Sequence, residues 1–285
     1  MPHSHRSNQR IDPVKFTLRE WTKRGLSLHW REILRRILKL LVKTIKNYFV
    51  IQKLHQTAKN EGKSVLFIIL TERLGDIIAG HPAAAGLEKP SQKIVWLVRD
   101  QYENMLKFNA HISNIVTVSS YTETIFLRKI FKEYEWKDLQ PDGYLCNMFG
   151  VTIKNPNKFG INRENYYEFG TLSDIYSLIG LGHKSESHPK IYKDDGFDVE
   201  RYLAAAFSNP NNGYIAIHVS SDDAARSWPA EKCQNLMDMI LKETNFNIIE
   251  FGLTPTLTEN KRVSLVKNAL PLSQQISLME TAKFL

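Results

Sequence analysis

Apolar residues recur along the chain in two different patterns, and the change between them divides the sequence. Within residues 29–55 they recur every three or four positions, as on one face of a helix. The residues on this face are Trp30, Leu34, Ile37, Leu41, Ile45 and Tyr48. From residue 65 onward, short apolar runs alternate with longer segments of helical spacing. This alternation is typical of a parallel β-sheet with helices packed on it.

The first alternating unit predicts four strands and four helices. The strands are expected at Val65–Leu70, Ile94–Val98, Ile115–Val118 and Tyr144–Met148. The helices are expected at Ile77–Leu87, Tyr102–Phe108, Thr122–Leu139 and Tyr166–Leu181. A stretch rich in His, Ser, Lys, Pro and Asp follows at 182–196, which indicates an interdomain linker.

Beyond the linker the alternation starts again. Strands are expected at Tyr214–Val219 and Asn247–Phe251, and helices at Val199–Phe207, Ala230–Lys242, Leu257–Lys267 and Ile276–Phe284. The chain therefore divides into an N-terminal extension (1–60), an N-terminal Rossmann-like domain (61–185) and a C-terminal Rossmann-like domain (197–285). A doubly wound sheet usually carries about five or six strands, and this second domain supplies only about three. We expect that it is incomplete, and that the two domains face each other across a ligand-binding cleft.

The net charge of +8 belongs to one segment of the chain. Residues 1–60 hold 14 Lys/Arg and 3 Asp/Glu, a balance of +11, whereas the remaining residues hold 24 and 27, a balance of −3. A nucleic-acid-binding domain is expected to carry a basic face of its own, so bulk charge does not indicate a nucleic-acid partner.

Several other classes of protein find no support in the sequence. Cys146 and Cys233 form no CxxC pair, so both are expected to be buried core thiols in a reducing compartment. The first 30 residues lack a secretory signal pattern, and no run approaches the roughly 18 apolar residues of a membrane span. Neither the GxGxxG nor the Walker fingerprint occurs. The isolated histidines, His81, His111, His183 and His188, are expected to be structural or surface residues.

The first candidate site is Arg73-Leu74-Gly75-Asp76, directly after a predicted buried strand. Gly75 permits a tight turn and a close backbone approach. Asp76 then stands at the entrance to the next helix, where two roles compete. It can cap the helix by accepting hydrogen bonds from free N–H groups, or it can act as a cleft carboxylate that takes a proton from an acceptor hydroxyl. The bare pattern favours the cap.

The second candidate site also lies between a strand and a helix. It runs from His218 through Ser220, Ser221, Asp222 and Asp223 to Arg226, Trp228 and Pro229. Free N–H groups at the start of the following helix attract a phosphate, and a guanidinium just upstream can bind a diphosphate with its forked donors. The alternative is a polar loop with Arg226 in solvent. Two adjacent carboxylates are a weak signal for a metal, so we expect none.

Together, the two loops resemble glycosyltransferase family 9, the ADP-heptose:lipopolysaccharide heptosyltransferases. The resemblance covers residues 64–285. It is carried by the strand Val65–Leu70 with Arg73–Asp76 and Pro82, the strand Lys93–Val98, the strand Tyr214–His218 with the turn Arg226–Glu231, and the helix at 273–283. The family implies a GT-B architecture of two Rossmann-like domains and an inverting sugar transfer without metal or cofactor.

The resemblance also implies a role for each site residue. Asp76 would be the general base, which reverses the preference for a simple cap, although one side chain can do both. Arg226 stands where the family has a lysine that binds the donor phosphate, and it keeps the positive charge. Ser220, Ser221, Trp228 and Thr254 would complete the donor site. Arg73 and Gly75 would belong to the acceptor-side loop.

This sequence departs from the family pattern in three places. Thr71, Glu72 and Arg73 replace the serines that usually precede the Gly-Asp pair. Thr254 stands in place of the glutamate that often holds the donor ribose. The family's Asp-(Ser/Thr)-Gly donor loop does not occur before Leu285, so we expect a truncated second domain that binds donor poorly.

The implied reaction moves heptose from ADP-heptose to a lipopolysaccharide core or a related glycan. Two alternatives stay open: a transferase of the same fold with another nucleotide sugar or a protein acceptor, and a non-catalytic binding protein of the membrane surface that keeps the fold. The basic residues of 29–55, Arg31, Arg35, Lys39, Lys43 and Lys46, run beside its apolar face. Such a helix can lie on an anionic membrane, or pack on its own domain or on a partner. A glycolipid acceptor favours the first, at the cytoplasmic side of the inner membrane.

Overall fold

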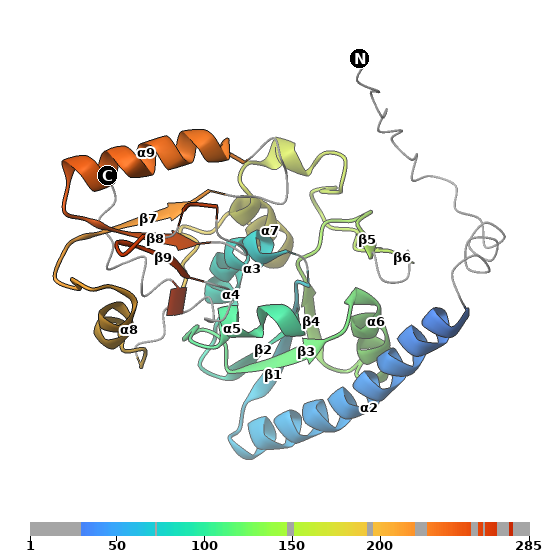
Figure 1. Cartoon of the computed structure of the whole chain (residues 1–285). Helices are drawn as coiled ribbons and strands as arrows, with labels where there is room; N and C mark the ends of the chain where they lie inside the picture. The colour runs from blue at the N-terminus through green and yellow to red at the C-terminus, as the bar shows by residue number, and fades with distance from the viewer. Residues whose placement is uncertain are drawn as a thin grey trace.

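The computed structural model describes residues 30–71, 73–146, 151–192, 196–219, 227–251, 256–258, 260–266 and 274–275. Its central elements are two parallel β-sheets flanked by helices (Figure 1). Each sheet has its own hydrophobic cores, one on each face. The predicted α/β class is therefore confirmed, whereas the division into 1–60, 61–185 and 197–285 and the facing arrangement stay predictions.

The first sheet has the strand order β3-β2-β1-β4, and all its pairs are parallel. Its strands are β1 (Ser64–Ile69), β2 (Gln92–Arg99), β3 (Asn114–Val118) and β4 (Glu135–Asp138). β1 and β2 are buried on both faces, which explains why they read as continuous apolar runs in the sequence. β4 lies at one edge and pairs only with β1.

Helices cover both faces of this sheet (Figure 1). Along β1, Leu66 and Ile68 point into one core, shared with α3 (Leu74–Ala79), α4 (His81–Leu87), α5 (Glu103–Leu106) and α7 (Leu172–Leu181). Phe67 and Ile69 point into the other core, shared with α2 (Trp30–Asn60) and α6 (Tyr121–Ile130). The alternation of side chains along a strand thus produces three layers. Short 3₁₀ helices at Asp100–Tyr102 and Tyr166–Phe169 complete the unit.

The second sheet has the strand order β7-β8-β9, again all parallel. Its strands are β7 (Tyr214–His218), β8 (Asn247–Phe251) and β9 (Val263–Val266). α8 (Val199–Ala206) packs on Ile249 and Phe251, and α9 (Ala230–Glu243) packs on Ile248 from the other side. Cys233 of α9 is buried, as expected, and its pKa is raised by that burial.

Two predicted elements are wrong in kind, and a third lies outside the parallel sheets. The helix expected at Thr122–Leu139 ends at Ile130, and β4 occupies its last part. β4 has an exposed-to-buried gradient and few apolar residues because it is an edge strand, so apolar periodicity gave no strand signal. The strand expected at Tyr144–Met148 is present as β5 (Leu145–Cys146), but it forms a short antiparallel pair with β6 (Val151–Thr152) and does not join the first sheet. The helix expected at Leu257–Lys267 gives way to β9, which pairs with β8.

The helix predicted at Ile77–Leu87 is two helices with a break at Gly80. A Cβ atom at Gly80 would lie 2.6 Å from Leu70 Cδ2 and 3.1 Å from the Trp96 ring. Glycine is therefore required here because the backbone lies directly against the core of the sheet. The helix expected at Ile276–Phe284 lies outside the described residues.

α2 is longer than predicted and is part of the first core. Its inner face buries Leu40, Ile51 and Ala58. Buried Asn47 donates hydrogen bonds to the Thr117 carbonyl at 2.8 Å and to Glu123 Oε1 at 2.6 Å, and Lys43 Nζ lies 2.7 Å from Asp100 Oδ1. Lys43, expected on the free basic face, therefore binds the body of the protein. The alternative that this helix packs on its own domain is correct for this face.

Substitution of Asn47 by alanine tests this attachment. Asn47→Ala removes a donor from the buried Glu123 carboxylate, whose pKa burial already raises. We expect the free energy of unfolding to fall by about 1–3 kcal/mol in urea titrations. Gln52→Ala, on the exposed side of the same helix, is the control and should change it by less than about 0.5 kcal/mol. Equal effects from both variants would contradict the attachment.

Candidate functional site

The strand order of the first sheet creates a switch point between β1 and β4. From β1 the chain proceeds to β2 and β3 on one side and then returns to β4 on the other side. In open parallel sheets, ligands bind outside the carboxyl ends of the strands at such a point. Thr71 follows β1 here, and Leu139 and Gln140 follow β4. The candidate site therefore lies at this edge.

Asp76 lies at this edge, one turn into α3, and is half-buried. Its Oδ2 accepts a hydrogen bond from the Arg73 backbone N–H at 3.1 Å, and its Oδ1 accepts one from the Tyr176 hydroxyl at 2.5 Å. Tyr176 belongs to α7 and is itself buried. Two donors from different elements thus fix the orientation of this carboxylate.

The capping role of Asp76 is partly confirmed, whereas its role as a proton acceptor stays a prediction. Asp76 does stabilise the helix start, because it satisfies a backbone N–H, but it does so from the third helical position. The N-cap residue is Arg73, and α3 begins at Leu74 and not at Ile77. A carboxylate has about four lone-pair sites, and two are used here, so each oxygen can accept another hydrogen bond. Capping therefore leaves Asp76 chemically available.

Arg73, Leu74 and Gly75 are exposed beside Asp76. Gly75 does not make the tight turn expected of it, because it lies within α3 and its φ is not positive. A Cβ atom at Gly75 would meet no atom within 4 Å. The open space on this side of Asp76 is what a close approach of a ligand to the backbone requires.

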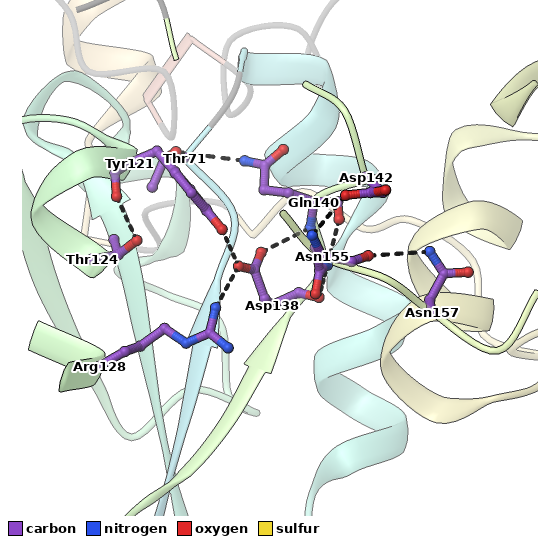
Figure 2. Close-up of polar contacts among 9 residues, drawn as sticks. All are labelled: Thr71, Tyr121, Thr124, Arg128, Asp138, Gln140, Asp142, Asn155 and Asn157. Atoms are coloured by element: carbon purple, nitrogen blue, oxygen red, sulfur yellow. Dashed lines mark hydrogen bonds and ion pairs between the residues drawn. The ribbon is translucent and has the colours of Figure 1, made fainter. Parts of the chain in front are cut away.

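A buried carboxylate that the sequence did not reveal anchors the neighbouring strand end (Figure 2). Asp138, the last residue of β4, is inaccessible to solvent. Its Oδ2 accepts hydrogen bonds from the Tyr121 hydroxyl at 2.5 Å and from Arg128 at 3.0 Å, and its Oδ1 accepts one from the Gln140 N–H at 3.1 Å. Burial raises the pKa of Asp138 to about 6 despite these donors. It also raises the pKa of Tyr121.

The Asp138 cluster extends to the end of β1 and to a following loop (Figure 2). The Gln140 amide lies 3.5 Å from Thr71 Oγ1, which links the ends of β4 and β1. Asn155 donates to the carbonyls of Asp138 at 2.9 Å and Gln140 at 2.5 Å, and its own N–H donates to Asp142 at 2.8 Å. The cluster therefore holds the rim of the switch point without presenting the Asp138 carboxylate to solvent.

Most residues predicted for the donor side lie outside the described residues. Ser220, Ser221, Asp222, Asp223 and Arg226 fall in 220–226, and Thr254 falls in 252–255. Their flanking elements are described: both segments directly follow parallel strands, β7 and β8. Trp228 is 47% exposed just before α9. Whether Asp76 and Arg226 lie across one cleft stays a prediction.

The start of α9 has a feature suited to an anion. Pro229 is the N-cap residue of α9, which begins at Ala230 as predicted. Proline has no side-chain acceptor, so it cannot satisfy the first-turn N–H groups as serine or aspartate would. Trp228, Pro229 and these N–H groups immediately follow the segment that holds Arg226.

Glu250 is a second residue that the sequence did not single out. It is buried in β8, and its carboxylate accepts hydrogen bonds from the backbone N–H groups of Thr256 at 2.8 Å and Leu257 at 3.3 Å. Glu250 thus fixes the backbone at Thr256 and Leu257 against the end of β8. Its position before Gly252 differs from that of the family glutamate, which follows the glycine.

Three of the isolated histidines come together at a cavity of about 440 Å³. His81, His111 and His188 line it, together with Lys190 and Tyr192 of the predicted linker. His81 is buried, its Nδ1 lies 2.5 Å from the Lys190 carbonyl, and burial lowers its pKa. The expectation that His81 is structural holds in the sense that it joins α4 to the linker.

No metal centre is found in the part of the chain that the structure describes. There, no three His, Cys, Asp or Glu side chains are grouped so that they could hold an ion. Asp222 and Asp223 are not among the residues searched.

Alanine at Gly75 tests whether the glycine is needed for folding or for a ligand. Gly75→Ala is expected to raise the free energy of unfolding by up to about 1 kcal/mol, because alanine favours a helix and the added Cβ meets nothing. Gly80→Ala, whose Cβ would meet Leu70 and Trp96, is expected to lower it by about 1–3 kcal/mol. Chemical denaturation distinguishes them, and a destabilised Gly75→Ala protein would contradict the open space.

The pH dependence of stability tests the burial of Asp138. The folded state keeps a proton on Asp138 up to about pH 6, whereas an unfolded aspartate releases it near pH 4. Between these values the folded state binds more protons, so its stability falls as pH rises, by on the order of 2 kcal/mol. Asp138→Asn should remove this component. Urea titrations from pH 4 to 7 on both proteins measure it, and parallel profiles would rule out the elevated pKa.

The structure is similar to solved structures of glycosyltransferases. A glycosyl transferase of family 9 from Veillonella parvula DSM 2008 matches with a TM-score of 0.56 at 16% identity, over 77% of this chain and 74% of that chain. The E. coli ADP-heptose lps heptosyltransferase II matches with a TM-score of 0.55 at 13% identity, over 77% of each chain. No protein-family model and no curated protein matches the sequence. The chain thus has the fold of family 9 glycosyltransferase and heptosyltransferase structures, and the resemblance is confirmed at the level of fold, whereas the roles of the two loops stay predictions.

Proposed function

We propose that this protein transfers a sugar from a nucleotide-sugar donor to a hydroxyl group of a glycan acceptor, with Asp76 as the general base. The observation that carries the proposal is the carboxylate of Asp76. It is half-buried at the switch point of the first sheet, oriented by Tyr176 and the Arg73 N–H, and beside the open space at Gly75. The fold shared with glycosyltransferase structures supports the same class of reaction.

The proposed reaction begins with the acceptor hydroxyl hydrogen-bonded to a free lone pair of Asp76. As the acceptor oxygen attacks the anomeric carbon, its proton passes to the carboxylate. The attack comes from the face opposite the nucleotide, so the configuration inverts. The bond between the anomeric carbon and the diphosphate oxygen breaks, and its electron pair leaves with the nucleoside diphosphate. Tyr176 and the Arg73 N–H hold the base in position throughout.

The departing diphosphate gains negative charge as its bond breaks. Groups that bind this charge more strongly in the transition state than in the ground state accelerate the reaction. In the proposal these groups are Arg226 and the N–H groups at the start of α9. Trp228, Ser220, Ser221 and Thr254 would complete the donor site, and Glu250 would position the Thr254 loop through its hydrogen bonds to that loop's backbone. This route needs no metal ion.

The identities of the donor and of the acceptor are also part of the proposal. ADP-heptose is proposed as the donor because the E. coli protein with this fold is an ADP-heptose lps heptosyltransferase. The acceptor would be a lipopolysaccharide core or a related glycolipid, which implies a peripheral location at the cytoplasmic surface of the inner membrane. A same-fold transferase with another donor or a protein acceptor, and a binding protein without turnover, are the alternatives that the assays below separate.

Substitution of Asp76 by asparagine is the decisive test of catalysis. Asparagine keeps the shape, but its single amide oxygen can accept only one of the Arg73 and Tyr176 hydrogen bonds, and it cannot take a proton. We expect a loss of about 10²–10⁴-fold in kcat for ADP release from ADP-heptose in the presence of heptose-free lipopolysaccharide acceptor. The melting temperature should change little.

Asp174→Asn is the matched control for this test. Asp174 is the third residue of α7 and accepts the Thr171 N–H at 3.0 Å, as Asp76 does for Arg73 in α3. Both variants therefore lose the same capping interaction, and only Asp76→Asn should lose turnover. Normal turnover of Asp76→Asn would refute the base. Turnover with another nucleotide sugar only would identify the same-fold alternative, and donor binding without any turnover would identify the binding protein.

A further inference from the structure

α2 has a second apolar face that the core does not use. Six large apolar side chains on this helix are between 45% and 67% exposed. They are Leu34, Leu38, Leu41, Val42, Ile45 and Phe49, called the apolar stripe below. Their spacing of three, four and seven residues places them on one side of the helix. Exposed apolar side chains gathered in this way mark an interaction surface.

The apolar stripe differs from the face that packs on the sheet. The packed face consists of Leu40, Asn47, Ile51 and Ala58, which are buried. At 100° per residue, Ile45 lies about 160° from Asn47 around the helix axis. Among the described residues, no part of the core therefore covers the stripe while α2 packs on the first sheet. The sequence placed Tyr48 on the same apolar face as Leu41 and Ile45, but Tyr48 packs against the core through Phe131.

Cations line one side of the apolar stripe. Lys39, Lys46 and Lys53 are exposed and follow one another at seven-residue intervals along the helix. Residues 30–60 hold eight Lys/Arg and one acidic residue, Glu32. An apolar stripe bordered by lysines complements a surface that has an apolar interior and anionic groups at its boundary with water. A bilayer containing anionic lipids has this chemistry.

A second copy of the chain fits the same surface less well. Paired helices usually place oppositely charged residues beside the apolar seam, where they form interhelical ion pairs. Here the flanking residues are lysines, and two identical helices would bring like charges together. Charge complementarity therefore favours lipid headgroups over self-association.

We propose that the apolar stripe of α2 docks this protein onto an anionic lipid bilayer, with Lys39, Lys46 and Lys53 on the headgroups. α2 would lie in the plane of the membrane and would not cross it. None of the described helices is long and apolar enough to span a bilayer. This inference concerns a surface remote from the chemistry, and it does not depend on the proposed sugar transfer.

The position of the stripe would bring the candidate site close to the membrane. α2 leads through residues 61–63 into β1, so the helix and this strand run in opposite directions (Figure 1). At Lys43 the helix contacts Asp100 and Thr117, at the carboxyl ends of β2 and β3. The preceding 13 residues of α2 extend roughly 20 Å further. The N-terminal half of the stripe therefore reaches past the same sheet edge at which Asp76 lies.

Vesicle binding by the full chain tests this inference with a readout other than transfer. The wild-type protein should co-sediment with vesicles of phosphatidylcholine and phosphatidylglycerol in equal amounts, and not with vesicles of phosphatidylcholine alone. Val42→Glu/Phe49→Glu, which changes two stripe residues, should weaken binding by at least about tenfold. Lys39→Gln/Lys46→Gln/Lys53→Gln should weaken it by a similar factor and reduce its dependence on salt.

Two controls match these variants in exposure. Met239→Glu changes an apolar side chain of α9 that is 63% exposed, and Lys89→Gln/Lys232→Gln/Lys242→Gln removes three exposed lysines elsewhere. Both controls should bind as the wild type does. Failure of the wild type to bind anionic vesicles would overturn the proposal, as would unchanged binding by Val42→Glu/Phe49→Glu. A dimer in sedimentation velocity that this variant converts to a monomer, with vesicle binding unchanged, would assign the stripe to a second copy instead.

Discussion

The burial of the Asp138 carboxylate is the interaction on which the carboxyl edge of the first sheet depends. Removing a carboxylate from water is costly unless hydrogen bonds replace the water, and here α6 and the Gln140 backbone supply those bonds. In return, one charged group fixes the end of β4, the start of the following loop and the orientation of α6. Through Gln140 and Asn155 the same hydrogen-bond network extends to Thr71, at the end of β1 and shortly before the helix that carries Asp76. The site is therefore built on a rigid rim.

The central strands could be predicted from the sequence because burial on both faces leaves a continuous apolar run. β1, β2, β3, β7 and β8 were expected within two residues of their observed bounds. β4 and β9 could not be predicted, since β4 is an edge strand with charged residues and β9 is defined by its pairing with β8. In both cases, tertiary pairing outweighed the local pattern.

Only part of the candidate site could be predicted, for a similar reason. Asp76 was recognisable because it follows an apolar run and precedes a helix. Tyr176, which orients Asp76, is 100 residues away in the sequence, and no local pattern joins the two. Asp138 and Gln140 could be recognised only if Glu135–Asp138 had first been identified as a strand. Ligands bind at the carboxyl ends of parallel strands, so polar residues are candidates for a site there. Glu250 was hidden in the same way, as a charged residue inside an apolar strand.

The anchoring of α2 through Asn47 and Lys43 has a consequence for any encounter with lipid. The helix is continuous with the core and lacks a flexible tether, so its exposed side and the first sheet must move as one rigid body. A bilayer held by that side would fix both the height and the tilt of Asp76 above the headgroups. In the proposed reaction, acceptors would then be selected by how far their reactive hydroxyl protrudes from the lipid, and a longer or shorter glycan stem would miss Asp76.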